Sequence, residues 1–308
     1  MRALFNLPAP AKINWFLHVT GRRADGYHTL QTVFQFIDWC DSIDLVVRDD
    51  GVICRHGADD LPADDLCVRA TRSLQQATGC TLGVDITLRK TIPQQAGLGG
   101  GSSDAATVLI GLNRLWNLRL SRARLMQLAL QLGADVPVFI FGRNAWAQGI
   151  GEDLQAIDLP TPRFAVVHPA RGLSTRAVFS TLGLTTLQGE AKIAGFAEWL
   201  AAVFAAEGEG CGGGESGGAA SCSVLCGQSL WGRNDLQAGA EMLEPAVAWA
   251  ARELQQLQPR FAARMTGSGS AVFAVVGTHD ALGALPAGWT GRVCQGLARH
   301  PLQHWIQA

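Results

Sequence analysis

Residues 93–106, with the sequence PQQAGLGGGSSDAA, lie between a segment patterned as a strand and a segment patterned as a helix. Before them, residues 84–88 alternate apolar and polar side chains, which is typical of a half-buried strand. After them, from near Ser103 onward, apolar residues recur at helical spacing from Ala106 to Trp116. The pattern therefore predicts a glycine-rich connection that leads directly into a helix.

This connection has the chemistry of a phosphate-binding loop. Glycines allow backbone turns that other residues avoid, and they let amide groups approach a ligand closely. The first turn of the helix adds unpaired N–H donors and the positive end of the helix dipole. The run lacks the lysine of a Walker-type loop, and its consecutive glycines do not fit a dinucleotide fingerprint. A polyphosphate is the favoured ligand, and a connection that binds nothing is the alternative.

Further motifs lie on both sides of this loop. Residues 8–17 (PAPAKINWFL) and 22–28 (RRADGYH) precede it, and residues 132–139 (LGADVPVF) and 266–273 (TGSGSAVF) follow it. In this order, the motifs resemble the signature motifs of the GHMP kinase superfamily. The resemblance covers nearly the whole chain and departs most clearly at the glycine-rich residues 207–223.

The resemblance implies an α+β, two-domain GHMP kinase fold with the active site in the cleft between the domains. Prolines interrupt the pattern near residues 158–163, which predicts domains over residues 1–160 and 161–308. In the second half we expect helices over residues 192–206 and 236–257. The composition of residues 207–223 predicts a flexible surface loop.

The resemblance also implies the reaction. The co-substrate would be ATP with Mg²⁺, and the product an alcohol phosphate. The ADGYH motif at residues 24–28, the glycine loop at residues 97–106 and residues 132–139 are together similar to the branch that phosphorylates the 2-hydroxyl of a cytidine-diphosphate-linked sugar alcohol in non-mevalonate isoprenoid synthesis. Two other functions compete: another kinase of the superfamily, acting on mevalonate or homoserine, and a catalytically inactive nucleotide-binding module.

The candidate catalytic residues are Lys12 and Asp135. The chain has only three lysines, and a lysine is a compact point charge that arginine does not replace. The resemblance implies that Lys12 and Asp135 together polarise the attacking hydroxyl, with Asp135 as the base. Without the resemblance, the alternative for Lys12 is a solvated residue on an edge strand. The alternative for Asp135 is a helix cap ahead of Pro137.

The candidate substrate-binding residues are aromatic or polar. Tyr27 is the only tyrosine, and beside His28 it offers a stacking face and a hydrogen-bonding ring for a planar base. The alternative for this pair is a β-turn whose aromatic ring packs on residues 30–36. The resemblance implies that Tyr27 and His28 hold the cytosine, that Phe179 closes the stack with Thr175 nearby, and that Asn14 belongs to the same site. A core position is the alternative for Phe179.

The candidate nucleotide-binding residues surround the glycine loop. They are Leu66, Lys90, Pro93, Gly97, Leu98, Gly99, Gly100, Gly101, Ser102 and Ser103. For Lys90, solvation at a strand end is an equal alternative. Ser102 or Ser103 is the candidate hydroxyl near Mg²⁺, and Asp104 is a candidate support for the helix N-terminus. Asp65 stands where relatives carry asparagine, which leaves the adenine contacts open.

Composition predicts a cytoplasmic enzyme. The 308 residues carry a formal net charge of −1, with no basic excess for nucleic acid or a membrane surface. The first residues lack the pattern of a signal peptide, and no apolar run is long enough to span a membrane. The eight cysteines are scattered, so we expect free thiols, with a metal site or disulfide at Cys211, Cys222 and Cys226 as the alternative. We expect small-molecule substrates as partners and a monomer or weak homodimer.

Overall fold

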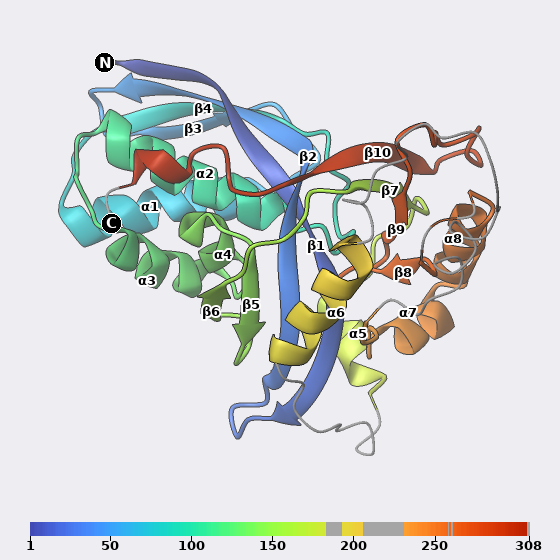
Figure 1. The fold of residues 1–308 in the computed structure, drawn as a ribbon. Helices are drawn as coiled ribbons and strands as arrows, with labels where there is room; N and C mark the ends of the chain where they lie inside the picture. The colour runs from blue at the N-terminus through green and yellow to red at the C-terminus, as the bar shows by residue number, and fades with distance from the viewer. Residues whose placement is uncertain (183–192, 206–230, 258, 260, 307–308) are drawn as a thin grey trace, which may run out of the picture.

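The computed structural model describes residues 1–182, 193–205, 231–257, 259 and 261–306. The glycine-rich residues 207–223, with Cys211 and Cys222, lie outside the described residues, as do Cys226 and Lys192. Within the described ranges, helices pack on a mixed sheet of ten strands (Figure 1). The fold is α+β, as the sequence predicts.

Two long strands form the spine of the molecule. Strand β1 (Ala3–Arg22) pairs antiparallel with β2 (His28–Arg48), and the turn between them carries Tyr27. In the register, Lys12 lies opposite Phe36 of β2. The hairpin runs from the top of the molecule in Figure 1 to its lower end, so a single pair of strands contributes to both halves.

The first half of the sheet continues from β2. Strand β4 (Gly83–Arg89) pairs antiparallel with β2, and β3 (Ile53–His56) pairs parallel with β4. On the other part of β2, β5 (Ala145–Gln148) pairs with β2 and with β6 (Asp153–Ala156). Four helices lie below the sheet in Figure 1. They are α1 (Leu66–Thr78), α2 (Gly100–Leu115), α3 (Arg122–Leu132) and α4 (Val136–Phe141).

The second half of the sheet is formed by strands from the C-terminal half of the chain. Strand β10 (Thr290–Leu297) pairs with β7 (Arg163–His168), and Gly296 and Leu297 pair with β2, so the sheet is continuous. The remaining strands are β8 (Arg264–Met265) and β9 (Val272–Val276). The helices are α5 (Thr175–Ser180), α6 (Ile193–Ala205), α7 (Gln237–Leu243) and α8 (Ala246–Gln255), and the 3₁₀ turn is Gln303–Trp305.

One helix prediction was wrong. Residues 236–257 form two short helices, α7 and α8, that are separated at Glu244 and Pro245. A proline lacks the amide hydrogen and its ring clashes with the preceding turn, so it ends one helix and starts the next. The other predicted helix, over residues 192–206, is α6.

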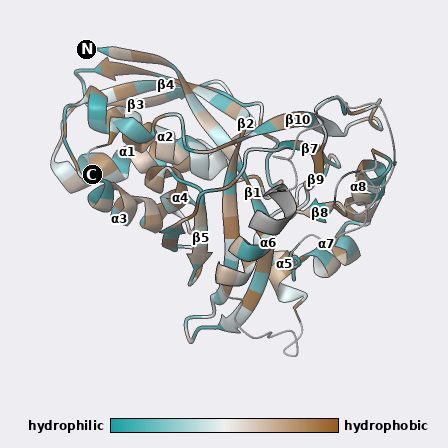
Figure 2. Cartoon of the chain, in the orientation of Figure 1, coloured by the Kyte–Doolittle hydropathy of each residue, from teal (hydrophilic) through white to brown (hydrophobic). Residues whose placement is uncertain are grey.

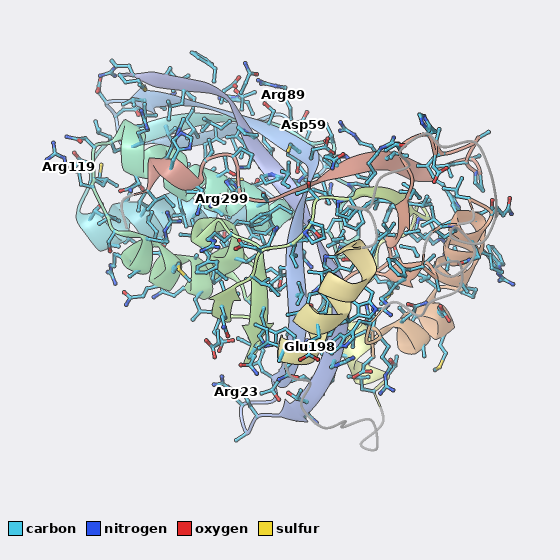
Figure 3. The ribbon with its side chains drawn as sticks, viewed as in Figure 1. Arg23, Asp59, Arg89, Arg119, Glu198 and Arg299 are labelled. Carbon is cyan, nitrogen blue, oxygen red and sulfur yellow. The ribbon has the colours of Figure 1, made fainter. Side chains whose placement is uncertain are left out.

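Hydrophobic residues are frequent along the strands and helices of the first half (Figure 2), and their apolar side chains form one buried cluster. A second cluster contains Trp15 and Phe16 of β1 together with Phe164 of β7 and Phe273 of β9. Because β1 packs into cores on both sides, the boundary near residue 160, which falls between β6 and β7, stays a prediction. On the surface, charges of both signs project outward, among them Arg23, Asp59, Arg89, Arg119, Glu198 and Arg299 (Figure 3).

Candidate active site

A cavity of about 1310 Å³ opens between the glycine loop, the β1–β2 hairpin and α5. Its walls come from both halves of the chain. Every predicted site residue except Ser103 lines it. The structure therefore brings together the motifs that lie far apart in the sequence.

The glycine loop requires glycine at two positions for steric reasons. Gly97 and Gly99 have φ angles of 75° and 73°, in the left-handed region. A Cβ atom at Gly97 would lie 2.2 Å from the carbonyl oxygen of Thr266, and one at Gly99 would lie 3.1 Å from the Lys12 side chain. The loop thus lies in close contact both with Lys12 of β1 and with Thr266 of the 266–273 motif.

Helix α2 begins at Gly100, three residues before the predicted start. The amide groups of its first turn have no partners within the helix, so they are available to an anion in the cavity. Ser103 is fully buried and its amide donates to the Gly99 carbonyl at 2.8 Å. Its predicted nucleotide contact therefore receives no support, and Ser102 is the loop hydroxyl that lines the cavity.

Lys12 and Asp135 form the centre of the cavity. Lys12 is 2% exposed, and its Nζ donates to Asn14 Oδ1 at 2.7 Å and to the Gly97 carbonyl at 2.8 Å. The same nitrogen lies 3.4 Å from Asp135 Oδ2, whose side chain is 39% exposed. Asp135 stands at the N-cap of α4, but its side chain makes no capping hydrogen bond. The carboxylate is therefore free to face the cavity, and the helix-cap alternative is wrong for the side chain.

Asn14 is more deeply buried than a simple ligand contact requires. Its side chain is 2% exposed and bonds to Lys12, Thr32 and Thr266. Its backbone amide also donates to Thr266 Oγ1 at 2.9 Å. A substrate contact by Asn14 stays a prediction, and its clearest role is to accept the hydrogen bond from Lys12.

Aromatic rings lie at the far end of the cavity. The His28 and Phe179 rings stack, with centroids 5.0 Å apart and planes 23° from parallel. Tyr27 is 61% exposed and also lines the cavity, so it does not pack on β2 as the alternative held. Burial, and then the positive charge of Arg22, lowers the pKa of His28, which favours the neutral ring that both donates and accepts. Thr175 pairs with Ser268 through their hydroxyl oxygens at 2.9 Å.

Phe179 also touches the core, because it packs against the cluster of β7, β8 and β9. Its ring packs against this cluster and also stacks on the His28 ring. The two interpretations of Phe179 are compatible.

Lys90 is buried between two carboxylates and is not solvated at the strand end. Its Nζ lies 2.7 Å from Asp104 Oδ2 and also bonds to Asp41, whose side chain is completely buried. Burial by itself would lower the pKa of Lys90, but Asp104 and Asp41 outweigh it, so the pKa is raised. Burial raises the pKa of the Asp104 carboxyl to about 7, against the effect of Lys90. A direct nucleotide contact by Lys90 stays a prediction.

Asp65 has a structural partner that explains why asparagine is not required there. Its Oδ1 accepts from the amides of Cys67 and Val68, at 2.8 and 3.1 Å, and so caps α1. Its Oδ2 forms an ion pair with Arg55 Nε at 2.6 Å, and both side chains are nearly buried. Arg55 in turn donates to the carbonyl of Leu61, which lines the cavity with Leu66.

Sequence reasoning missed Asp41 and Thr32. Asp41 lies 49 residues before Lys90 and reads as an ordinary acidic residue within a strand. Thr32 is fully buried beneath Asn14, and a threonine in a strand carries no signal of its own. The only clue was their spacing of two residues from apolar side chains, Leu30 and Phe34 for Thr32 and Trp39 and Ile43 for Asp41, which places them on the same faces as those residues.

Comparisons with known proteins agree with this site. Residues 65–143 match the model of the GHMP kinases N terminal domain, and residues 222–291 match that of the GHMP kinases C terminal domain. The 4-diphosphocytidyl-2-C-methyl-D-erythritol kinase of Paracidovorax citrulli is 49% identical over 99% of this chain and 98% of its own length. The enzyme of the same name from Delftia acidovorans is 48% identical over 100% of this chain and 99% of its own.

Solved structures extend the likeness. A crystal structure of 4-(cytidine 5'-diphospho)-2C-methyl-D-erythritol kinase has a TM-score of 0.72 and 30% identity, covering 96% of this chain and 99% of its own. A homoserine kinase from Cytophaga hutchinsonii has a TM-score of 0.63 at 14% identity, covering 97% and 95%, which shows a common fold alone. The chain therefore belongs to the GHMP kinase superfamily and, within it, to the family of 4-diphosphocytidyl-2-C-methyl-D-erythritol kinases.

Proposed function

We propose that this protein transfers the γ-phosphoryl group of ATP to the 2-hydroxyl of 4-diphosphocytidyl-2-C-methyl-D-erythritol. The products are the 2-phosphate and ADP, in non-mevalonate isoprenoid precursor synthesis. One observation carries the proposal: the Lys12–Asp135 pair, at 3.4 Å, shares its cavity with both the glycine loop and the aromatic group of Tyr27, His28 and Phe179. The near full-length relatives are named as kinases of this substrate.

In this proposal, Asp135 orients the attacking hydroxyl and accepts its proton. Its carboxylate is exposed enough to reach a ligand, while Lys12 behind it is almost fully buried. The Lys12 ammonium attracts this carboxylate and stabilises the negative charge that develops on the transferred group. Phosphoryl transfer depends mainly on such positioning and charge stabilisation, because its transition state is loose.

The glycine loop would hold the phosphates of ATP with backbone amides. The free N–H groups of the first turn of α2 are the donors, and Ser102 adds a hydroxyl. Lys90 brings positive charge to the same wall of the cavity.

Magnesium would be held mainly by the phosphates. Oxygen donors suit this ion, and Ser102 and Asp104 both line the cavity. The Oδ1 atom of Asp104 is buried and has no hydrogen-bond partner within the described part of the chain, so it fits a cation's need for oxygen. The part of the chain that the structure describes contains no group of three or more acidic, histidine or cysteine side chains that could hold a metal ion. When bound, the ion would neutralise phosphate charge.

The cytosine would bind at the aromatic end. Phe179 offers a ring face that the core holds in place, and the neutral His28 ring can read a base edge. Tyr27 is exposed at the rim, where it can close over the base. Mevalonate and homoserine offer no base to stack, so these residues favour the cytidine substrate over theirs.

The experiment is a coupled ADP-release assay with purified protein, ATP and Mg²⁺. The diphosphocytidyl methylerythritol, mevalonate and homoserine are offered separately. We expect turnover with the cytidine substrate alone. Turnover only with another alcohol would be consistent with the superfamily but would overturn the role of Tyr27 and His28. Nucleotide binding without turnover of any alcohol would favour an inactive module.

The cellular setting follows from the same proposal. No helix in the described ranges is long and apolar enough to cross a membrane. We expect the enzyme to act in the cytoplasm on small-molecule substrates, as a monomer or weak homodimer. Fractionation and light scattering test these two expectations.

A further inference from the structure

A chain of buried hydrogen bonds leads from Lys12 to two other residues of the cavity wall, Asn14 and Thr32. It joins Thr32 of β2 to Asn14 of β1 and then to the Lys12 ammonium. Thr32 and Asn14 are 0% and 2% exposed. The direction of each hydrogen bond in this chain can be assigned from its chemistry.

The first bond fixes the Thr32 hydroxyl. Its Oγ1 lies 2.5 Å from the carbonyl oxygen of Phe16, which can only accept. The single hydroxyl hydrogen therefore points to Phe16. Toward Asn14, the same oxygen can only accept.

The second bond then fixes the Asn14 amide. Its Nδ2 donates to Thr32 Oγ1 at 2.8 Å, so the NH₂ group is on the Thr32 side. The carbonyl oxygen Oδ1 consequently faces Lys12, at 2.7 Å from Nζ. A flipped amide would place NH₂ against the ammonium, and would set two oxygens together at Thr32 with no hydrogen between them.

The third step concerns the ammonium itself. Its three N–H bonds match three acceptors: Asn14 Oδ1, the Gly97 carbonyl and Asp135 Oδ2. The lysine side chain is a flexible chain of four carbons, so its hydrogen bonds fix the position of the ammonium group. Without the contact to Asn14, two acceptors would remain to hold it beside Asp135.

The strand register explains how Thr32 reaches this position. Asn14 pairs with Phe34 and Leu17 pairs with Thr32, so β1 carries one more residue than β2 between these pairs. Such a bulge bends the strand and redirects side chains, often beside an active site. Thr266 of the 266–273 motif also contacts Asn14: its Oγ1 accepts from the Asn14 backbone N–H at 2.9 Å and donates to Asn14 Oδ1 at 3.3 Å.

We propose that Thr32 is a positioning residue for phosphoryl transfer: its hydroxyl orients the Asn14 amide, and that amide holds the Lys12 ammonium toward Asp135. The proposal rests on the proposed function, since it assigns Thr32 to the same reaction. It concerns the chemical step, because Thr32 acts through Asn14 and Lys12.

The first test compares Thr32→Val with Thr32→Ser. Valine keeps the shape but removes the hydroxyl, whereas serine keeps the hydroxyl. We expect Thr32→Val to lower kcat by about 10- to 100-fold, because small displacements of a catalytic group carry such costs. Both KM values should stay within about twofold, and Thr32→Ser should retain most of kcat. Equal losses in Val and Ser, or a change confined to KM, would overturn the proposal.

A matched control is Thr107→Val. Thr107 is also a fully buried threonine, but its hydroxyl has no partner within the described residues, and it does not line the cavity. Its kcat should be unchanged. If Thr32→Val does not fold, as judged by thermal melting, Thr32→Ala against Thr32→Ser gives the same comparison.

A double-mutant cycle separates an action through Asn14 from a general structural effect. In an Asn14→Ala background, Thr32→Val should change kcat by less than about threefold, because the group it orients is gone. Full additivity of the two losses would contradict the proposal.

Crystal structures of the wild-type and Thr32→Val proteins make the test independent of turnover. The proposal expects the Asn14 amide to rotate and its contact with Lys12 Nζ to lengthen in the variant. An unchanged contact would overturn the role of Thr32. A wild-type protein inactive on the cytidine substrate would count against the proposed function instead.

Discussion

Lys12 and Lys90 lie beside the same glycine loop and are both largely buried, but their partners differ. Lys12 meets two neutral acceptors and the carboxylate of Asp135, which is 39% exposed. Lys90 meets two carboxylates, Asp41 and Asp104, that are 0% and 2% exposed. One ammonium stands behind a carboxylate that a ligand can reach, and the other is enclosed between carboxylates.

The balance of charge around each ammonium distinguishes the catalytic lysine from the structural one. At Lys12, one ammonium balances one carboxylate, so both can respond to charge that arrives with a substrate. At Lys90, two acids share one base in a buried site, and burial raises the pKa of Asp104 to about 7. We therefore expect changes at the Lys12 pair to alter mainly the rate of transfer, and changes at the Lys90 cluster to alter mainly stability.

The largest effect is expected for Asp135→Asn. The amide keeps the shape but cannot accept the proton or balance Lys12, so kcat should fall roughly 1,000-fold or more. The coupled ADP-release assay measures it, with the exposed Asp153→Asn on β6 as the matched control. A loss below tenfold would remove Asp135 from the chemistry.

The next effect is on stability, at Lys90→Met. This change leaves two buried carboxylates without their cation, which should lower the free energy of unfolding by about 3 kcal/mol. Urea denaturation measures it. The neighbouring Arg89→Met breaks a more exposed ion pair with Asp44 and should cost less than about 1 kcal/mol. Equal costs would show that the Lys90 cluster is not a special scaffold.

A smaller effect is expected for Phe179→Leu, away from both lysines. Losing the aromatic face that stacks on His28 should raise KM for the cytidine substrate about tenfold. KM for ATP should not change, because the nucleotide loop is elsewhere in the cavity. Steady-state kinetics, with each substrate varied in turn, measures the two KM values separately. A rise in both KM values would indicate a loss of folding instead.

The smallest effect is a pH dependence at Asp104→Asn. The folded-state pKa of Asp104, about 7, lies above its ordinary value of 3.8. Between these values the folded protein keeps a proton that the unfolded chain has released, so this group's contribution to stability falls as pH rises from about 4 to 7. Asparagine removes that contribution.

The measurement compares urea midpoints of the wild-type and Asp104→Asn proteins at pH 5, 6, 7 and 8. The stability of the wild type relative to the variant should decline toward pH 7 and then level off. A difference that does not change with pH would show that Asp104 does not titrate in this range.

The sequence predicted much of this arrangement, because glycine patterns and helical periodicity are local. The loop, the helix after it and the strand before it are where they were expected, and the resemblance placed Lys12 near Asp135. The break at Pro245 was also local and could have been recognised from the proline alone.

What remained hidden depends on contacts between distant strands. The role of Lys90 depends on Asp41, which reaches it through the pairing of β2 with β4. The role of Thr32 depends on a bulge in β1 and on which atom donates in each hydrogen bond. Neither role produces a recognisable pattern in the sequence, because each depends on residues that only the folded strands bring together.

The most direct measurement is single-turnover phosphoryl transfer, at saturating ATP and cytidine substrate, by Lys12→Met and Lys90→Met. We expect Lys12→Met to slow transfer roughly 1,000-fold, whereas Lys90→Met should stay within about tenfold of the wild type. The reverse ranking, or equal losses, would contradict the assignment of the chemistry to Lys12 and Asp135.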